Sequence, residues 1–124
     1  MNQESNRGQF SFSKDERITN KKIIQNLFES GKKIIFSPFI LKYLDERKES
    51  KNKVLISVSK SKIKSSVKRN LLKRRIRESY RLNKNIIKGL GYSFAFVYSS
   101  SKILSYNEIN KSLVELLNKV NQDV

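Results

Sequence analysis

The sequence SSVKRNLLKRRIRESYR, residues 65–81, contains no glycine or proline and has the pattern of an amphipathic helix. A serine at a helix start accepts hydrogen bonds from first-turn amides, so we predict that this helix begins near Ser65 or Ser66. The positions spaced at i, i+4, i+7 and i+8, where a helix buries its core-facing side, are Leu72, Ile76, Ser79 and Tyr80. The remaining elements are expected to form the scaffold that presents this helix.

The other side of the predicted helix is cationic. We call it the basic ridge: Asn70, Lys73, Arg74, Arg77 and Arg81. Most helical charge runs are solvated surfaces that mix both signs. Here Glu78 is the one acidic residue of the stretch, so neighbouring cations repel with little internal relief. Since arginine is favoured where phosphate is held, we expect the ridge to bind nucleic acid and its exposed cations to be dispensable for folding.

The whole chain is basic. Its 124 residues suit a single domain, and a net charge of +16 indicates an extensive polyanion as partner. No apolar run approaches the roughly 20 residues that span a bilayer, and residues 1–15 lack the order of a signal peptide. We therefore expect no membrane partner and a cytoplasmic location.

Catalytic groups are scarce. The chain has no cysteine and no histidine, which removes disulfides, thiolate nucleophiles, the usual zinc sites and histidine bases. Asp45, Glu46 and Glu49 are close in sequence, but their neighbours are basic and polar, which favours a solvated hairpin loop over a magnesium site. If the protein takes part in catalysis, another molecule must supply the chemistry.

The segments before the basic helix predict a tail, a helix and strands. Residues 1–16 are polar and predict a mobile tail, and residues 17–124 a single domain. A helix is expected after Thr19, with Gly31 as a left-handed stop. Residues 39–44 predict a strand that starts after the proline, on or near a sheet edge, and residues 34–36 are a candidate for an extra short strand.

Two further strands and a last helix complete the pattern. Residues 54–59 alternate as a half-buried strand, and residues 92–98 are apolar on both faces, as in a strand covered on both sides. Ser105 and Glu108 form a capping box before an amphipathic helix. The order of helix, two or three strands, basic helix, strand and helix predicts an α+β fold with one sheet.

The basic helix also resembles a known motif. Its order Arg69-Asn70, Lys73-Arg74, Ile76-Arg77-Glu78 and Tyr80-Arg81 is similar to the "RNR" helix of the bacterial ribonuclease P protein component. The preceding residues 56–60 resemble the strand that leads into that helix, and the resemblance extends over residues 17–120. Two positions depart from the family pattern: Leu71 replaces the last arginine of the motif, and Lys64 replaces a glycine of the preceding loop, which has one extra residue.

The resemblance implies a fold and a function. The implied fold is a sheet of about four strands in αβββαβα order, with the basic helix in a left-handed crossover, like the second domain of ribosomal protein S5. The implied function is that of the protein subunit of ribonuclease P, the endoribonuclease that removes the 5′ leader from precursor tRNA. In that family a catalytic RNA with bound magnesium performs the hydrolysis. The protein binds that RNA and the leader, lowers the magnesium requirement, and holds no metal tightly.

The resemblance also implies two sets of site residues and no catalytic residue in the protein. The set expected to bind RNA is Lys60, Lys62, Lys64, Lys68, Arg69, Asn70, Lys73, Arg74, Arg77 and Arg81. The leader is expected in a cleft between the first helix and the sheet, with Ile24 and Phe28 on the helix and Lys42 or Tyr43 on the strand. Family members have an aromatic residue at the position of Ile24. Phe28 fits a core position as well as a ligand contact.

Three other functions fit parts of the sequence. A small ribosomal or other structured-RNA protein has the same composition. A DNA-binding domain with the basic helix in a major groove is less favoured, because such helices usually belong to compact helical domains, and we expect no DNA partner. A nuclease that acts alone is least favoured, for want of catalytic groups.

Overall fold

The computed structural model describes residues 16–45, 51–89 and 91–123. The elements, in chain order, are α2 (Lys21–Ser30), β1 (Lys32–Phe36), β2 (Phe39–Asp45), β3 (Lys53–Val58), α3 (Ser66–Asn83), the 3-10 turn η2 (Lys84–Ile86), β4 (Tyr92–Tyr98) and α4 (Tyr106–Asp123). The expected tail lies outside the described residues except for Glu16, whose carboxylate pairs with Lys84 at 3.0 Å. Glu46 and Glu49 also lie outside them.

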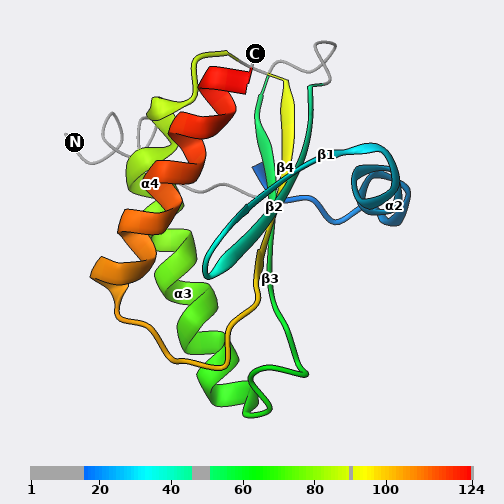
Figure 1. Ribbon diagram of the computed structural model, residues 1–124. Helices are drawn as coiled ribbons and strands as arrows, with labels where there is room; N and C mark the ends of the chain where they lie inside the picture. The colour runs from blue at the N-terminus through cyan, green and yellow to red at the C-terminus, as the bar shows by residue number, and fades with distance from the viewer. Residues whose placement is uncertain (1–15, 46–50, 90, 124) are drawn as a thin grey trace, which may run out of the picture.

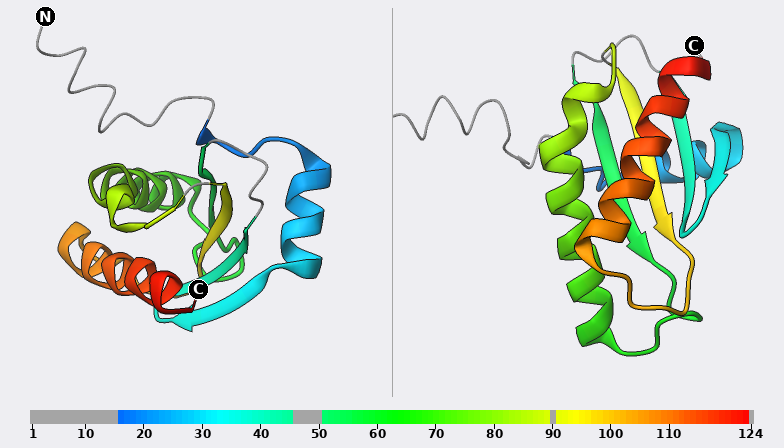
Figure 2. Two further views of the ribbon diagram at one scale, coloured as in Figure 1. Left: turned by 90° about the horizontal axis from the view of Figure 1, so that it is seen from above. Right: turned by 60° about the vertical axis from the view of Figure 1, so that its left-hand side comes forward.

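The four strands form one mixed sheet in the order β1-β2-β4-β3. β2 is antiparallel to β1 and β4, and β3 is parallel to β4. Helices α3 and α4 cover one face and α2 lies on the other (Figure 1; Figure 2). The predicted α+β class is confirmed, and the candidate strand at residues 34–36 is part of β1.

One expectation about strand placement was confirmed and one was wrong. β2 begins directly after Pro38 and lies next to the edge strand β1, as predicted for a strand on or near a sheet edge. The chain between β2 and β3 is not a hairpin connection, since β4 lies between these strands. Charged residues in that connection indicated a loop, but they carry no information about which strands it joins.

β3 and β4 are parallel neighbours connected through α3. In the right-hand view of Figure 2, α3 and α4 lie in front of the sheet, both strands point down, and β4 lies to the right of β3. The crossover is therefore left-handed, as the resemblance implied and against the usual right-handed rule.

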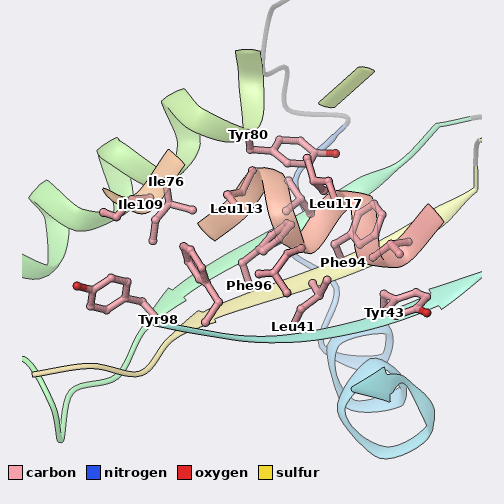
Figure 3. Close-up of a cluster of buried hydrophobic side chains, with 14 of the residues drawn as sticks. Leu41, Tyr43, Ile76, Tyr80, Phe94, Phe96, Tyr98, Ile109, Leu113 and Leu117 are labelled. Carbon is pink, nitrogen blue, oxygen red and sulfur yellow. The ribbon is translucent and has the colours of Figure 1, made fainter. Parts of the chain in front are cut away.

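The main core lies between the sheet and the helix pair α3 and α4 (Figure 3). The stripe predicted for α3 is buried throughout: Leu72, Ile76, Ser79 and Tyr80. The hydroxyl of Ser79 donates a hydrogen bond to Asn110 Oδ1 at 2.8 Å, which compensates its burial. On α4, Glu108 N donates to Ser105 Oγ at 3.2 Å and Ser105 N to Glu108 Oε2 at 3.0 Å, so the predicted capping box is confirmed.

Helix α2 begins after Thr19, as predicted, but it ends differently from the prediction. Its N-cap is Asn20, whose Oδ1 accepts from Lys22 N at 2.8 Å. Gly31 has φ −71°, so it is not a left-handed stop. A Cβ at this position would lie 2.3 Å from Leu27 O and 3.2 Å from Tyr43 O. Glycine is therefore needed for a close approach between the end of α2 and β2.

The rotation of α3 can be tested with Ile76→Ala. Because Ile76 is fully buried, the substitution should lower the free energy of unfolding by about 2–5 kcal/mol. The matched control is Arg74→Ala on the exposed side, which should change it by no more than about 0.5 kcal/mol. Urea melts of both variants measure the difference, and equal effects would mean that the helix faces were assigned wrongly.

Candidate nucleic-acid interface

A short turn carries three of the predicted lysines to the start of α3. Ile63 N donates to Ser59 O at 3.0 Å, and the Ile63 side chain is buried in the core. Lys60, Lys62 and Lys64 are exposed around it. Lys68 N donates to Ser65 Oγ at 3.3 Å, which confirms Ser65 as the N-cap. The amides of the first helical turn add positive potential at the place where these lysines gather.

The arginines of α3 are not equivalent. Arg69 donates from Nη1 to Ile63 O at 2.9 Å and to Lys64 O at 2.8 Å, so its guanidinium fastens the preceding turn to the helix. Arg75 Nη1 donates to Leu104 O in the connection between β4 and α4. Arg69 is thus half-buried and bonded to two backbone carbonyls, unlike the exposed cations of the ridge.

Arg81 is also engaged within the protein. It forms an ion pair with Glu78 one turn earlier on the same helix. The hydrogen bond from Arg81 holds the pKa of Glu78 below its usual range, and the same bond raises the pKa of Arg81. Since both side chains are well exposed, this pair contributes little to stability.

Other cations of the ridge are available to a ligand. Arg74 and Arg77 are exposed, and neither makes a hydrogen bond or ion pair with any residue that the structure describes. Asn70 and Lys68 are also exposed, and Lys73 is half-buried on the same helix. Because the apolar stripe of α3 is fixed against the core, Asn70, Lys73, Arg74 and Arg77 lie on the side of the helix away from it. Lys68, four residues before Leu72, lies at the helix start on the side of the stripe.

The structure separates the two alternatives for the strand side of the expected cleft. Lys42 lies on the α2 face of the sheet, where its Nζ donates to Phe28 O at 2.7 Å. Tyr43 points to the opposite face, is 2% exposed, and packs against Tyr92 and Phe94 (Figure 3). Lys42 is thus brought beside Phe28, and Tyr43 is a core residue.

Several apolar side chains share the α2 face with Lys42. Ile35 pairs with Ile40, and Ile40 with Val97, so these residues lie side by side across β1, β2 and β4. Ile35 is 66% exposed and Phe28 38%. We call this region the α2-side surface: Phe28, Ile35, Ile40, Lys42 and Val97. Ile24 is half-buried on α2 beside the second core cluster, of which Leu27 and Ala95 are part.

Sequence reasoning missed Ile35, Ile40 and Val97 as candidate site residues. In a strand, Ile40 and Lys42 share a face, but the partners across the sheet depend on register, which a single sequence does not specify. The exposure of Ile35 follows from its place on an edge strand that α2 does not cover.

The arrangement matches a known family. The family model for ribonuclease P matches residues 12–121. The chain belongs to the ribonuclease P protein family. The ribonuclease P protein component of Petrotoga mobilis is 33% identical over 89% of this chain and 95% of its own. The ribonuclease P protein component of Clostridium botulinum strain 657 is 35% identical to this chain, over 86% of this chain and 95% of the relative's length.

Solved structures of ribonuclease P proteins have the same fold. The RNase P protein from Staphylococcus aureus superposes with a TM-score of 0.72 at 25% identity, over 85% of this chain and 94% of that one. The RNase P protein from Thermotoga maritima gives a TM-score of 0.73 at 21% identity, over 84% and 96%.

Family membership makes the chain a component of the ribonuclease P ribonucleoprotein, an endoribonuclease complex of tRNA processing with an RNA partner. Within the described part of the chain, no helix is long and apolar enough to cross a membrane. Among the same residues, no three acidic, histidine or cysteine side chains are close enough to hold a metal ion.

The division among the arginines predicts different effects of substitution. Arg69→Ala should lower the free energy of unfolding by about 1–3 kcal/mol, because two carbonyls lose a charged donor in a part-buried site. Arg77→Ala should change stability by no more than about 0.5 kcal/mol and weaken only RNA binding. Thermal melts of the free protein measure the difference, and a fully stable Arg69→Ala variant would contradict the anchoring role.

Proposed function

We propose that this protein docks on the catalytic RNA of ribonuclease P through the basic ridge and its preceding lysines, and holds the precursor tRNA 5′ leader on the α2-side surface. The hydrolysis belongs to the RNA and its bound magnesium. The observation that carries the proposal is the segregation of the two surfaces: exposed cations of α3 lie on one side of the sheet, and the exposed apolar patch lies on the other.

The ridge suits a folded RNA. Arg74 and Arg77 offer planar guanidinium groups without an internal partner among the described residues, which is the donor geometry that matches phosphate. Lys60, Lys62 and Lys64 extend the same charge beyond the helix start, and Lys68 adds to it in the first turn of α3. Such contacts act on backbone phosphates, so they position the protein without reading sequence.

The α2-side surface suits an unpaired strand. Single-stranded nucleic acid is held by apolar or aromatic side chains under the bases and by cations along the backbone. Phe28, Ile35 and Ile40 are the apolar side chains of this surface. Lys33 and Lys42 lie on the same face of the sheet and supply the cations. Ile24 is aliphatic, which leaves Phe28 as the ring available for stacking on α2. Contacts of this kind tolerate many leader sequences.

The composition supports assigning the chemistry to the RNA. Activating water and stabilising charge on phosphate requires a base or paired metal ions, and this chain has no histidine and no cysteine. Its net charge of +16 instead offsets repulsion between RNA phosphates, a task that magnesium ions perform in the bare RNA. The protein should therefore lower the magnesium requirement without entering the reaction.

A leader-truncation experiment tests the assignment of the two surfaces. At low magnesium, the protein should tighten binding of leader-bearing precursor tRNA to the holoenzyme far more than binding of leaderless tRNA. Phe28→Ala should remove most of this difference by abolishing one base contact, worth about 1–3 kcal/mol. The matched control is Ile103→Ala, which truncates an apolar side chain of the same 38% exposure outside α2 and the sheet.

Equal improvement in the binding of both substrates, or an equal loss of leader-dependent binding in both variants, would contradict leader binding at this surface.

The assignment of the chemistry to the RNA is tested with the same reagents. Purified protein without the RNA should not cleave precursor tRNA at any magnesium concentration, and cleavage by the protein alone would overturn that part of the proposal.

A further inference from the structure

A hollow of about 140 Å³ lies at the free edge of the sheet, apart from the α2-side surface. It is lined by residues 17–19, by residues 54–56 of β3, and by Arg77 of α3. β3 is the edge strand farthest from β1, whereas Ile35 and Ile40 lie on β1 and β2. The hollow is therefore a separate feature beside the basic ridge.

The edge of β3 is only partly covered. Ile18 N donates to Val54 O at 3.0 Å, and Arg17 forms a single parallel bridge with Val54. Ser59 N donates to Tyr98 O on β4, so alternate residues of β3 direct their backbone groups to the two edges. Ile56 has the same parity as Val54. Its N–H and C=O lie on the outer edge, and no residue in the described ranges pairs with them there.

Arg77 lies at the other side of the hollow. It is exposed and makes no hydrogen bond or ion pair with a described residue, so its guanidinium is free to contact a ligand. A planar guanidinium can stack on an unpaired RNA base or form a bidentate hydrogen bond with a phosphate. Ile56, whose backbone donor and acceptor point outward, lines the same hollow as Arg77, together with the aliphatic residues Ile18 and Leu55. This combination of groups is suited to a nucleotide.

The volume selects the size of the ring. An apolar cavity of roughly 150 Å³ is known to hold one benzene molecule. A hollow of about 140 Å³ therefore seats one six-membered ring, and the second ring of a purine would project beyond it. Uracil and cytosine each present an adjacent donor and acceptor on one edge, which complements the N–H and C=O of Ile56.

We propose that this hollow binds one unpaired pyrimidine nucleotide of an RNA strand, with the backbone of Ile56 on the base edge and Arg77 against the ring or its phosphate. The inference rests on the proposed function only in taking RNA as the ligand. It adds a base-specific contact to a surface that otherwise contacts phosphates.

The test is a titration of the isotope-labelled full-length protein with UMP, followed by NMR. UMP should shift the amide signals of Thr19 and Ile56 in a saturable way, whereas ribose 5-phosphate, which has no base, should leave Ile56 unchanged. AMP should bind more weakly than UMP. Thr19→Phe should fill the hollow and weaken UMP binding about tenfold or more, which is the effect expected when one base is no longer held. The control Thr19→Ser should keep the UMP affinity of the unaltered protein.

UMP shifts confined to Phe28 and its neighbours, the absence of shifts at Ile56, or AMP binding as tight as UMP would each overturn the assignment. The mapping on the unaltered protein gives this answer whether or not Thr19→Phe folds. Binding of the catalytic RNA to the unaltered protein is measured alongside. If the protein does not bind this RNA, the proposed function is contradicted. If it binds the RNA but Ile56 does not respond to UMP, only the assignment of the hollow is overturned.

Discussion

The packing of the α3 stripe onto the sheet is the interaction on which the rest of the structure depends. Leu72, Ile76 and Tyr80 are almost completely buried, and the Tyr80 ring lies 5.9 Å from that of Phe96. Burial of such side chains is worth about 1.5–3 kcal/mol each. Repulsion between neighbouring cations on an exposed helix face costs only a few tenths of a kcal/mol per pair, so the core determines the rotation of the helix and the ridge follows from it.

The same rotation divides the basic residues by task. Arginines at the margins of the buried stripe reach backbone carbonyls: Arg69 binds the turn before α3, and Arg75 binds the connection before α4. Arg74 and Arg77 lie opposite the stripe and are exposed to solvent. Neither makes a hydrogen bond or an ion pair with a described residue. A planar group with several donors serves both purposes, which explains why one helix uses arginine for internal fastening and for an external polyanion.

Local patterns predicted most of the fold, and long-range pairing accounts for the errors. The stripe of α3, the capping box at Ser105 and the strand at residues 92–98 each depend on neighbours within a few residues, and all were confirmed. The pairing of β2 with β4 instead of β3 depends on strand order, which periodicity does not encode. At the site, the alternation of side chains along β2 puts Lys42 and Tyr43 on opposite faces of the sheet, so knowing the buried face is enough to place both residues. The anchoring role of Arg69 required the path of the preceding turn.

The central claim is that the exposed cations of α3 neutralise RNA phosphates while its inner arginines do not. The salt dependence of binding to the catalytic RNA measures this most directly. For Arg74→Gln/Arg77→Gln, the slope of log K against log salt should become shallower by about 0.7–0.9 for each phosphate that is no longer neutralised. Arg75→Gln should leave the slope unchanged, because this guanidinium bonds to Leu104 O. An unchanged slope in the double variant, or an equal change in Arg75→Gln, would contradict the account.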